Sequence, residues 1–172
     1  MKQRKNNASS TRRLTTLAIL VSVAMVLSYV EHLIPVFIAV PGVKLGLANI
    51  ATVFALYALG WREACAISLV RVCLSALLFG NVPALIYSLS GAALSVAVMI
   101  LLYFLCSFSS VGVSVAGGVA HNAGQLLAAA LVMNTPALVS YFPVLVLSGT
   151  LAGVVIGLCA GLLIKRLGKI LR

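Results

Sequence analysis

Residues 85–105 read LIYSLSGAALSVAVMILLYFL, a run that contains no charged side chain. A transmembrane helix needs about 20 mostly apolar residues to cross the hydrocarbon core of a bilayer, and this run is long enough. Comparable apolar runs recur up to the C-terminus, so we do not expect a cleaved leader followed by a soluble domain. The stretch therefore predicts an α-helix that spans a membrane.

The composition of the whole chain agrees with this prediction. Of the 172 residues, 63% are hydrophobic and 8% are charged, and the mean hydropathy is +1.21. Soluble domains carry roughly 25% charged residues. We therefore expect an all-α membrane protein that passes several times through the cell membrane, with no room for a separate catalytic domain.

Turns rich in glycine, proline and asparagine divide the apolar sequence into six predicted spans. The expected spans cover residues 14–30, 45–59, 64–79, 85–105, 113–133 and 139–164. They would form one transmembrane domain, residues 14–164, folded as a six-helix bundle. A basic tail at residues 1–13 and a basic end at residues 165–172 would flank it, and we expect no regular structure in the first ten residues.

The net charge of +10 is concentrated at the two ends of the chain. Five of the twelve Lys and Arg residues precede the first predicted span, and four follow the last. Basic residues tend to stay on the cytoplasmic side during membrane insertion, so both termini are predicted to be cytoplasmic. Their expected partners are anionic lipid headgroups and not a nucleic acid.

Arg71 is the most costly residue in the predicted spans. It follows Arg62 by nine residues, about 13 Å of helix, which places it near the middle of the hydrocarbon. An arginine at the centre of a spanning helix costs about 2.5–3.5 kcal/mol to insert. Its side chain could bond to Asn49 or to backbone carbonyls, or extend towards Glu31. Alternatively, it could supply positive charge to an anionic ligand that enters from outside.

Two further groups of polar residues lie in or beside predicted spans. His121, Asn122 and Gln125 interrupt an apolar span, and His121 and Gln125 share one helix face because they are four residues apart. These side chains could fasten helices together by hydrogen bonds or contact a ligand. Lys44 lies in a tight loop just before the span that contains Asn49. It could hold an anion at that helix start or lie among lipid headgroups.

Small residues are spaced for close helix packing in the first and last spans. Four glycines recur every four residues in the last span and would let another backbone approach closely: Gly149, Gly153, Gly157 and Gly161. Ala18 and Ser22 have the same spacing in the first span. The pattern leaves open whether the neighbouring helix belongs to this chain or to a partner.

Signatures of catalysis and metal binding are missing from the sequence. It contains two acidic residues, which excludes an aspartate-rich site for magnesium and a diphosphate, and it has no glycine-rich phosphate loop. The four cysteines form no CxxC pair and lie in or beside apolar segments, as expected of core residues. We expect no catalytic residue, no metal and no cofactor, and we do not expect the chain to be an enzyme by itself.

Four motifs together resemble a bacterial membrane family. They are PGVKLGLAN at residues 41–49, LYALGWRE at 56–63, Arg71 with LLFG at 77–80, and VSVAGGVAHNAGQ at 113–125. The family is usually described as heptaprenyl diphosphate synthase component I, or as the Gx transporter family. The resemblance covers nearly the whole chain after the N-terminal tail.

This family is similar in turn to the S components of energy-coupling-factor transporters, which are six-helix membrane proteins that bind vitamins. The resemblance implies uptake of a small, vitamin-like or isoprenoid-related compound, and the positive charge of Arg71 predicts that this compound is anionic. It also implies contact of the first helix, near Ala18 and Ser22, with a transmembrane coupling subunit and its ATPases. Together with the polar residues, it predicts a substrate site made of Lys44, Asn49, Arg71, His121, Asn122 and Gln125. The family's description leaves an alternative, an accessory membrane subunit in polyprenyl (heptaprenyl) diphosphate synthesis.

Overall fold

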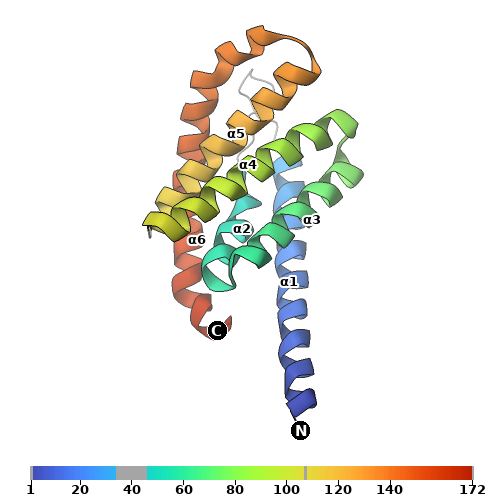
Figure 1. Cartoon of the computed structure of the whole chain (residues 1–172), viewed down its shortest axis with the longest axis vertical. Helices are drawn as coiled ribbons and strands as arrows, with labels where there is room; N and C mark the ends of the chain where they lie inside the picture. Colours follow the sequence, from blue (N-terminus) through green and yellow to red (C-terminus); the bar gives the residue numbers. More distant parts are fainter. Residues whose placement is uncertain (1, 34–45, 107, 172) are drawn as a thin grey trace.

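The computed structural model describes residues 2–33, 46–106 and 108–171, and most of these residues lie in helices (Figure 1). The elements are α1 (Lys2–Leu33), α2 (Asn49–Ala58), α3 (Trp61–Phe79), α4 (Val82–Cys106), α5 (Ser110–Val132), the 3-10 helix η1 (Pro136–Tyr141) and α6 (Phe142–Leu171). The predicted all-α fold class is confirmed for this part of the chain.

Turn residues explain where several of these helices begin. Gly60 separates α2 from α3 with φ 131°, a conformation that residues with a Cβ rarely adopt. Ser109 caps α5, because its hydroxyl accepts a hydrogen bond from the Gly112 N–H at 3.3 Å. Pro136 opens η1, where its missing N–H leaves no bond unmade.

Four helical segments are long and apolar enough to cross a membrane within the described residues. They are Thr11–Leu33, Val82–Leu105, Ser110–Val132 and Pro136–Gly168. Each coincides with one of the predicted spans. Helix α3 has 19 residues but carries Arg62, Glu63 and Arg71, which make it less apolar than α4, α5 and α6. The described part of the chain thus supports a multi-span membrane protein with four such segments in place of the six predicted.

Helix α2 corrects the prediction of a span at residues 45–59. It has ten residues, so it is about 15 Å long, half the thickness of the hydrocarbon core. Seven of its ten residues are buried inside the protein. A helix that is apolar on all sides can be enclosed by lipid or by other helices. Hydropathy therefore could not distinguish a short buried helix from a spanning one.

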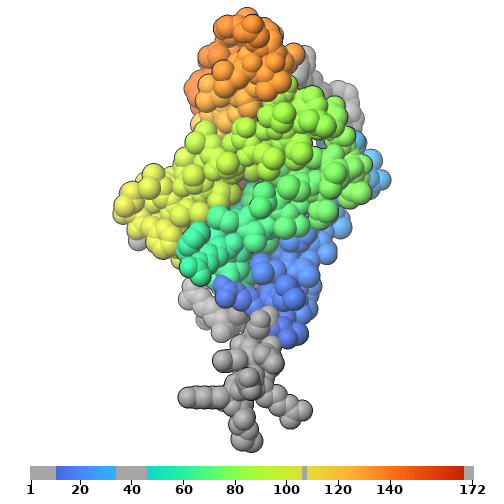
Figure 2. Space-filling view, turned by 45° about the vertical axis from the view of Figure 1, so that its right-hand side comes forward, coloured from blue at the N-terminus to red at the C-terminus, as the bar shows by residue number. Residues whose placement is uncertain are grey.

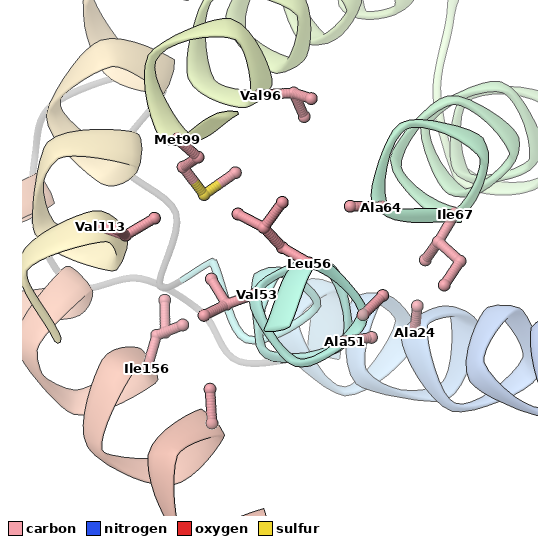
Figure 3. Close-up of a cluster of buried hydrophobic side chains, with 12 residues drawn as sticks. Ala24, Ala51, Val53, Leu56, Ala64, Ile67, Val96, Met99, Val113 and Ile156 are labelled. Carbon is pink, nitrogen blue, oxygen red and sulfur yellow. The ribbon is translucent and has the colours of Figure 1, made fainter. Parts of the chain in front are cut away.

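The core surrounds α2, which packs against α1, α3 and α6 and touches α5. Figure 3 shows Val53 and Leu56 of α2 among side chains from the neighbouring helices. Both α2 residues are fully buried. These contacts fix α2, and with it Asn49 at its first turn, inside the bundle.

The predicted absence of regular structure in the first ten residues is wrong, because α1 begins at Lys2. Lys, Gln, Arg and Ala are good helix formers and extend the apolar helix towards the N-terminus. The N- and C-termini lie towards the same end of the molecule in Figure 1, as an even number of crossings requires. The cytoplasmic location of that end remains a prediction.

Large apolar side chains cover much of the outer surface of the long helices. Val26 on α1 is 62% exposed, and Leu151 and Leu162 on α6 are exposed to a similar extent. Figure 2 shows α3 and α4 lying side by side across the molecule, with α1 emerging below them. Soluble monomers rarely expose apolar surface this extensive, whereas lipid chains would cover it. The surface therefore agrees with a location in the membrane.

Candidate functional site

A cavity of about 400 Å³ lies among α1, α3, α4 and α5. This volume is within the range of sites that bind small molecules. Helices far apart in the sequence supply its polar lining, which consists of Ser28, Glu31, His32, Arg71, Ser75, Ser88, His121 and Gln125. The cavity therefore brings together three of the six predicted substrate residues: Arg71, His121 and Gln125.

The cavity lies far from the basic N-terminal part of α1. Glu31 and His32 belong to the last turn of α1, and Phe79 and Gly80 to the end of α3. Eighteen residues separate Glu31 from Arg13 along α1, a rise of about 27 Å. This distance approaches the thickness of a bilayer core, so the cavity is at the other end of the helix from the basic residues.

Arg71 borders both this cavity and a second one of about 50 Å³. Its Nη2 donates a hydrogen bond to Asn49 Oδ1 at 3.3 Å, and its buried Nε has no hydrogen-bond partner among the residues that the structure describes. Burial disfavours the guanidinium charge, and the Glu31 carboxylate offsets part of this effect. Asn49 and Glu31, two neighbours foreseen from the sequence, therefore lie near Arg71. The guanidinium nevertheless has N–H groups left for further hydrogen bonds, and Arg71 lines the large cavity.

Glu31 is a site residue that the sequence reasoning missed. It lines both cavities, and one of its carboxylate oxygens accepts a hydrogen bond from the Gly46 N–H. From the sequence, Glu31 is expected as a possible contact of Arg71 but not as part of the substrate site. The scarcity of acids offered a signal, because only Glu31 and Glu63 could balance a buried arginine.

Asn49 owes its position to the turn that starts α2. The Asn49 N–H donates to the Gly46 carbonyl at 2.8 Å, and Gly46 adopts φ 70°. This turn directs the Asn49 amide towards Arg71 and places it in the lining of the smaller cavity. Lys44, predicted to add charge at this helix start, lies outside the described residues.

The polar cluster of α5 is divided between two neighbours. His121 and Gln125 line the large cavity. The Asn122 side chain instead turns towards α6, where its Nδ2 donates to the Leu145 carbonyl at 2.8 Å and lies 3.5 Å from the Ser148 hydroxyl. Asn122 is 7% exposed and also reaches the lining of the smaller cavity. Its geometry favours the interhelical role over direct ligand contact.

Close packing of α4 on α5 fixes the positions of His121 and Gln125. A Cβ built on Gly91 of α4 would lie 2.7 Å from the His121 carbonyl oxygen and 2.6 Å from Gln125 Cγ. Only glycine allows this approach. The α4 backbone therefore supports these two side chains directly at the cavity.

Aromatic side chains form an apolar wall beside the charged groups. The rings of His32 and Phe79 stack with centroids 5.8 Å apart, and Tyr29 packs against Phe79 at 5.4 Å. His32 and Phe79 both line the large cavity. The cavity thus combines a charged region around Arg71 and Glu31 with an apolar one around Phe79.

The four glycines of α6 pack against α5 of the same chain. Gly149 lies against Gly118, Gly153 against Val115, Gly157 against Val111, and Gly161 against Ser110. The small residues of α1 differ from these glycines in their exposure. Ala18 and Ser22 are exposed, and the Ser22 hydroxyl donates to the Ala18 carbonyl at 2.9 Å. Within the described residues, therefore, they do not serve internal packing.

The two acidic residues of the chain are far apart. Glu63 is 5% exposed and forms a salt bridge with Arg13, whereas Glu31 lines the cavity about 27 Å further along α1. In the described segments, no three His, Cys, Asp or Glu side chains converge as metal ligands. The arrangement can bind and orient a polar ligand, but it does not provide the paired acids of a magnesium–diphosphate site.

The family model for heptaprenyl diphosphate synthase component I matches residues 20–163. The chain belongs to this family. The match extends from the middle of α1 almost to the end of α6 and includes every described residue that lines the cavity. No curated protein and no solved structure matches this family member.

Proposed function

We propose that this protein is a substrate-binding component of the membrane that captures a small compound through an anionic group and delivers it for uptake. The observation that carries this proposal is the position of Arg71. Arg71 lines a cavity of about 400 Å³, and its buried Nε has no hydrogen-bond partner among the described residues. A buried arginine with unused donor capacity is costly, and an anionic group of a ligand in the cavity would bind its guanidinium.

The location of the cavity supports capture from outside the cell. Basic residues at both ends of the chain favour a cytoplasmic location for the termini. The cavity lies at the other end of α1, about 27 Å from Arg13. In this orientation the ligand would enter from the outer side.

The side chains around Arg71 would each bind a different part of the ligand. Arg71 would hold the anionic group, and Asn49 would keep the guanidinium in place through the bond that it already accepts. His121 and Gln125 would form hydrogen bonds to other polar atoms, and Phe79 would contact the apolar body, since all three line the cavity.

Partners would supply the energy for release into the cytoplasm. The sequence contains no glycine-rich phosphate loop that would bind ATP. The exposed small residues Ala18 and Ser22 on α1 would contact a transmembrane coupling subunit, which in turn would bind ATPases. Small residues allow such close contact between helices inside a membrane.

The family's description favours a second candidate function, that of an accessory membrane subunit in polyprenyl diphosphate synthesis. In this role the chain would assist a separate catalytic subunit, because its own two acids lie far apart. This alternative predicts that prenyl elongation by a soluble synthase rises when the purified chain is added. The uptake proposal predicts no such stimulation.

Native mass spectrometry of the protein purified in mild detergent tests the proposed function. We expect a bound small molecule in the parent protein and its loss in Arg71→Gln. The matched control is Arg62→Gln, which removes an exposed arginine from the same helix. Hydrogen bonds to charged groups contribute about 1.5–3 kcal/mol, so Arg71→Gln should weaken binding by about 10- to 150-fold. Equal retention by both variants would show that Arg71 does not bind the ligand.

A further inference from the structure

We infer that the ligand is zwitterionic, with a cationic group for Glu31 beside the anionic group for Arg71; this inference rests on the proposed function. Glu31 and Arg71 line the same large cavity and also the same small one. The site therefore presents both signs of charge to whatever occupies it.

Neutral groups hold each charge in place. The Glu31 carboxylate accepts the Gly46 N–H, and Arg71 donates to Asn49. Glu31 acts electrostatically on Arg71, yet the two do not form a direct ion pair among the contacts of the described residues. Opposite charges attract strongly in a medium of low dielectric constant. Both side chains line the same cavity, so a ligand group there can lie beside each of them.

Charge balance favours a ligand that carries both signs. With neutral histidines, Arg71 and Glu31 sum to zero, and they are the charged residues in the described lining of the two cavities. A simple anion would leave the occupied site with a net negative charge next to Glu31. Buried charges need compensation. A zwitterion satisfies Arg71 and Glu31 together and keeps the occupied site neutral.

The remainder of the cavity sets the shape of the ligand. Phe79, stacked with His32, provides an apolar wall, and Val72 and Ala76 extend it along α3. A volume of about 400 Å³ accepts a compact molecule with a short apolar body. The geometry fits an amino-acid-like head, in which an amine and an acid group lie close together on such a body.

Thermal-shift and calorimetric titrations of the purified protein in lipid nanodiscs test this inference. The probes are four sets of small metabolites: amino acids and other zwitterions, carboxylates and phosphates, amines, and uncharged compounds. Each set is tested on the parent protein, Glu31→Gln, Arg71→Gln and the control Arg62→Gln. The double variant Glu31→Gln/Arg71→Gln retains the net charge of the parent and shows whether the cavity still folds when both charges are absent.

We expect zwitterions to bind the parent protein most tightly. Glu31→Gln should weaken them about 10- to 100-fold, because it removes a hydrogen bond to a charged group. The same variant should strengthen the binding of simple anions, because it removes a repelling charge. Arg62→Gln should match the parent for every set.

Two different results would overturn the inference, and they can be told apart. If simple anions bind the parent best, lose affinity in Arg71→Gln and are unaffected by Glu31→Gln, the zwitterionic ligand is wrong while the proposed function stands. If no set binds the parent protein, the zwitterionic ligand and the proposed function both fail.

Discussion

Substitution of Gly157 by alanine tests the packing of α6 on α5, which supports the wall of the smaller cavity. A Cβ at residue 157 would lie 2.5 Å from Val111 Cα and 3.0 Å from the Ser110 carbonyl oxygen. Ordinary contacts of a Cβ begin at 3.4 Å, so the two helices would have to separate by about 0.9 Å (3.4 minus 2.5). Backbone atoms on α5 cannot rotate away as a flexible side chain could.

Two opposing effects determine how much Gly157→Ala changes the free energy of unfolding. Overpacking of this kind costs about 1–3 kcal/mol, whereas alanine is favoured over glycine in a helix by up to about 1 kcal/mol. We therefore expect Gly157→Ala to destabilise the protein by about 1–2 kcal/mol. Gly168→Ala is the matched control on the same helix, because its Cβ would meet only Ile164 Cγ2 at 3.8 Å. This control should be neutral or slightly stabilising.

Unfolding in mixed micelles of mild detergent and dodecyl sulfate, followed by circular dichroism, measures both variants. The free energies of unfolding should differ by about 2 kcal/mol, with Gly157→Ala the less stable. Equal stability of the two variants would refute the close α5–α6 contact and would reopen the possibility that this glycine stripe faces a partner.

Two further predictions separate structural residues from the site. Asn122→Ala removes the hydrogen bond to the Leu145 carbonyl and should cost about 0.6–1.5 kcal/mol in the same unfolding assay. It should leave ligand affinity within about twofold; a loss as large as that of Arg71→Gln would return Asn122 to the binding site. Arg13→Ala leaves the buried Glu63 carboxylate unpaired and should cost about 1–2 kcal/mol, since Arg13 itself is 59% exposed. Adding Glu63→Gln should recover part of that loss in a double-mutant cycle, and strictly additive losses would mean that the ion pair contributes nothing.

The sequence predicted the parts of the fold that depend on length and hydropathy. Uninterrupted apolar runs such as residues 85–105 correspond to long helices, and the glycine spacing in the last helix correctly indicated a close helix neighbour. The prediction of a span at 45–59 failed because an apolar sequence pattern indicates that water is excluded but not whether lipid or protein excludes it. Only tertiary contacts could show that α2 is enclosed.

One candidate site residue could be located from its large energetic cost in a membrane, and its role in binding remains a prediction. Arg71 stands out because charge in hydrocarbon is expensive, and its contact with Asn49 was among the alternatives foreseen. Glu31 was missed because its role depends on the crossing of α1 and α3, which no local pattern encodes. His121 and Asn122 are adjacent in sequence, yet the helical rotation between them sends one to the cavity and the other to α6.

An experimental structure of the protein in lipid nanodiscs, with the compound that purifies with it, tests the central claim most directly. We predict density for a small molecule in the cavity, with an anionic group within hydrogen-bond distance of the Arg71 guanidinium. A collapsed cavity in which Arg71 and Glu31 pair directly, without a bound compound, would contradict the claim that this arginine exists to bind a ligand.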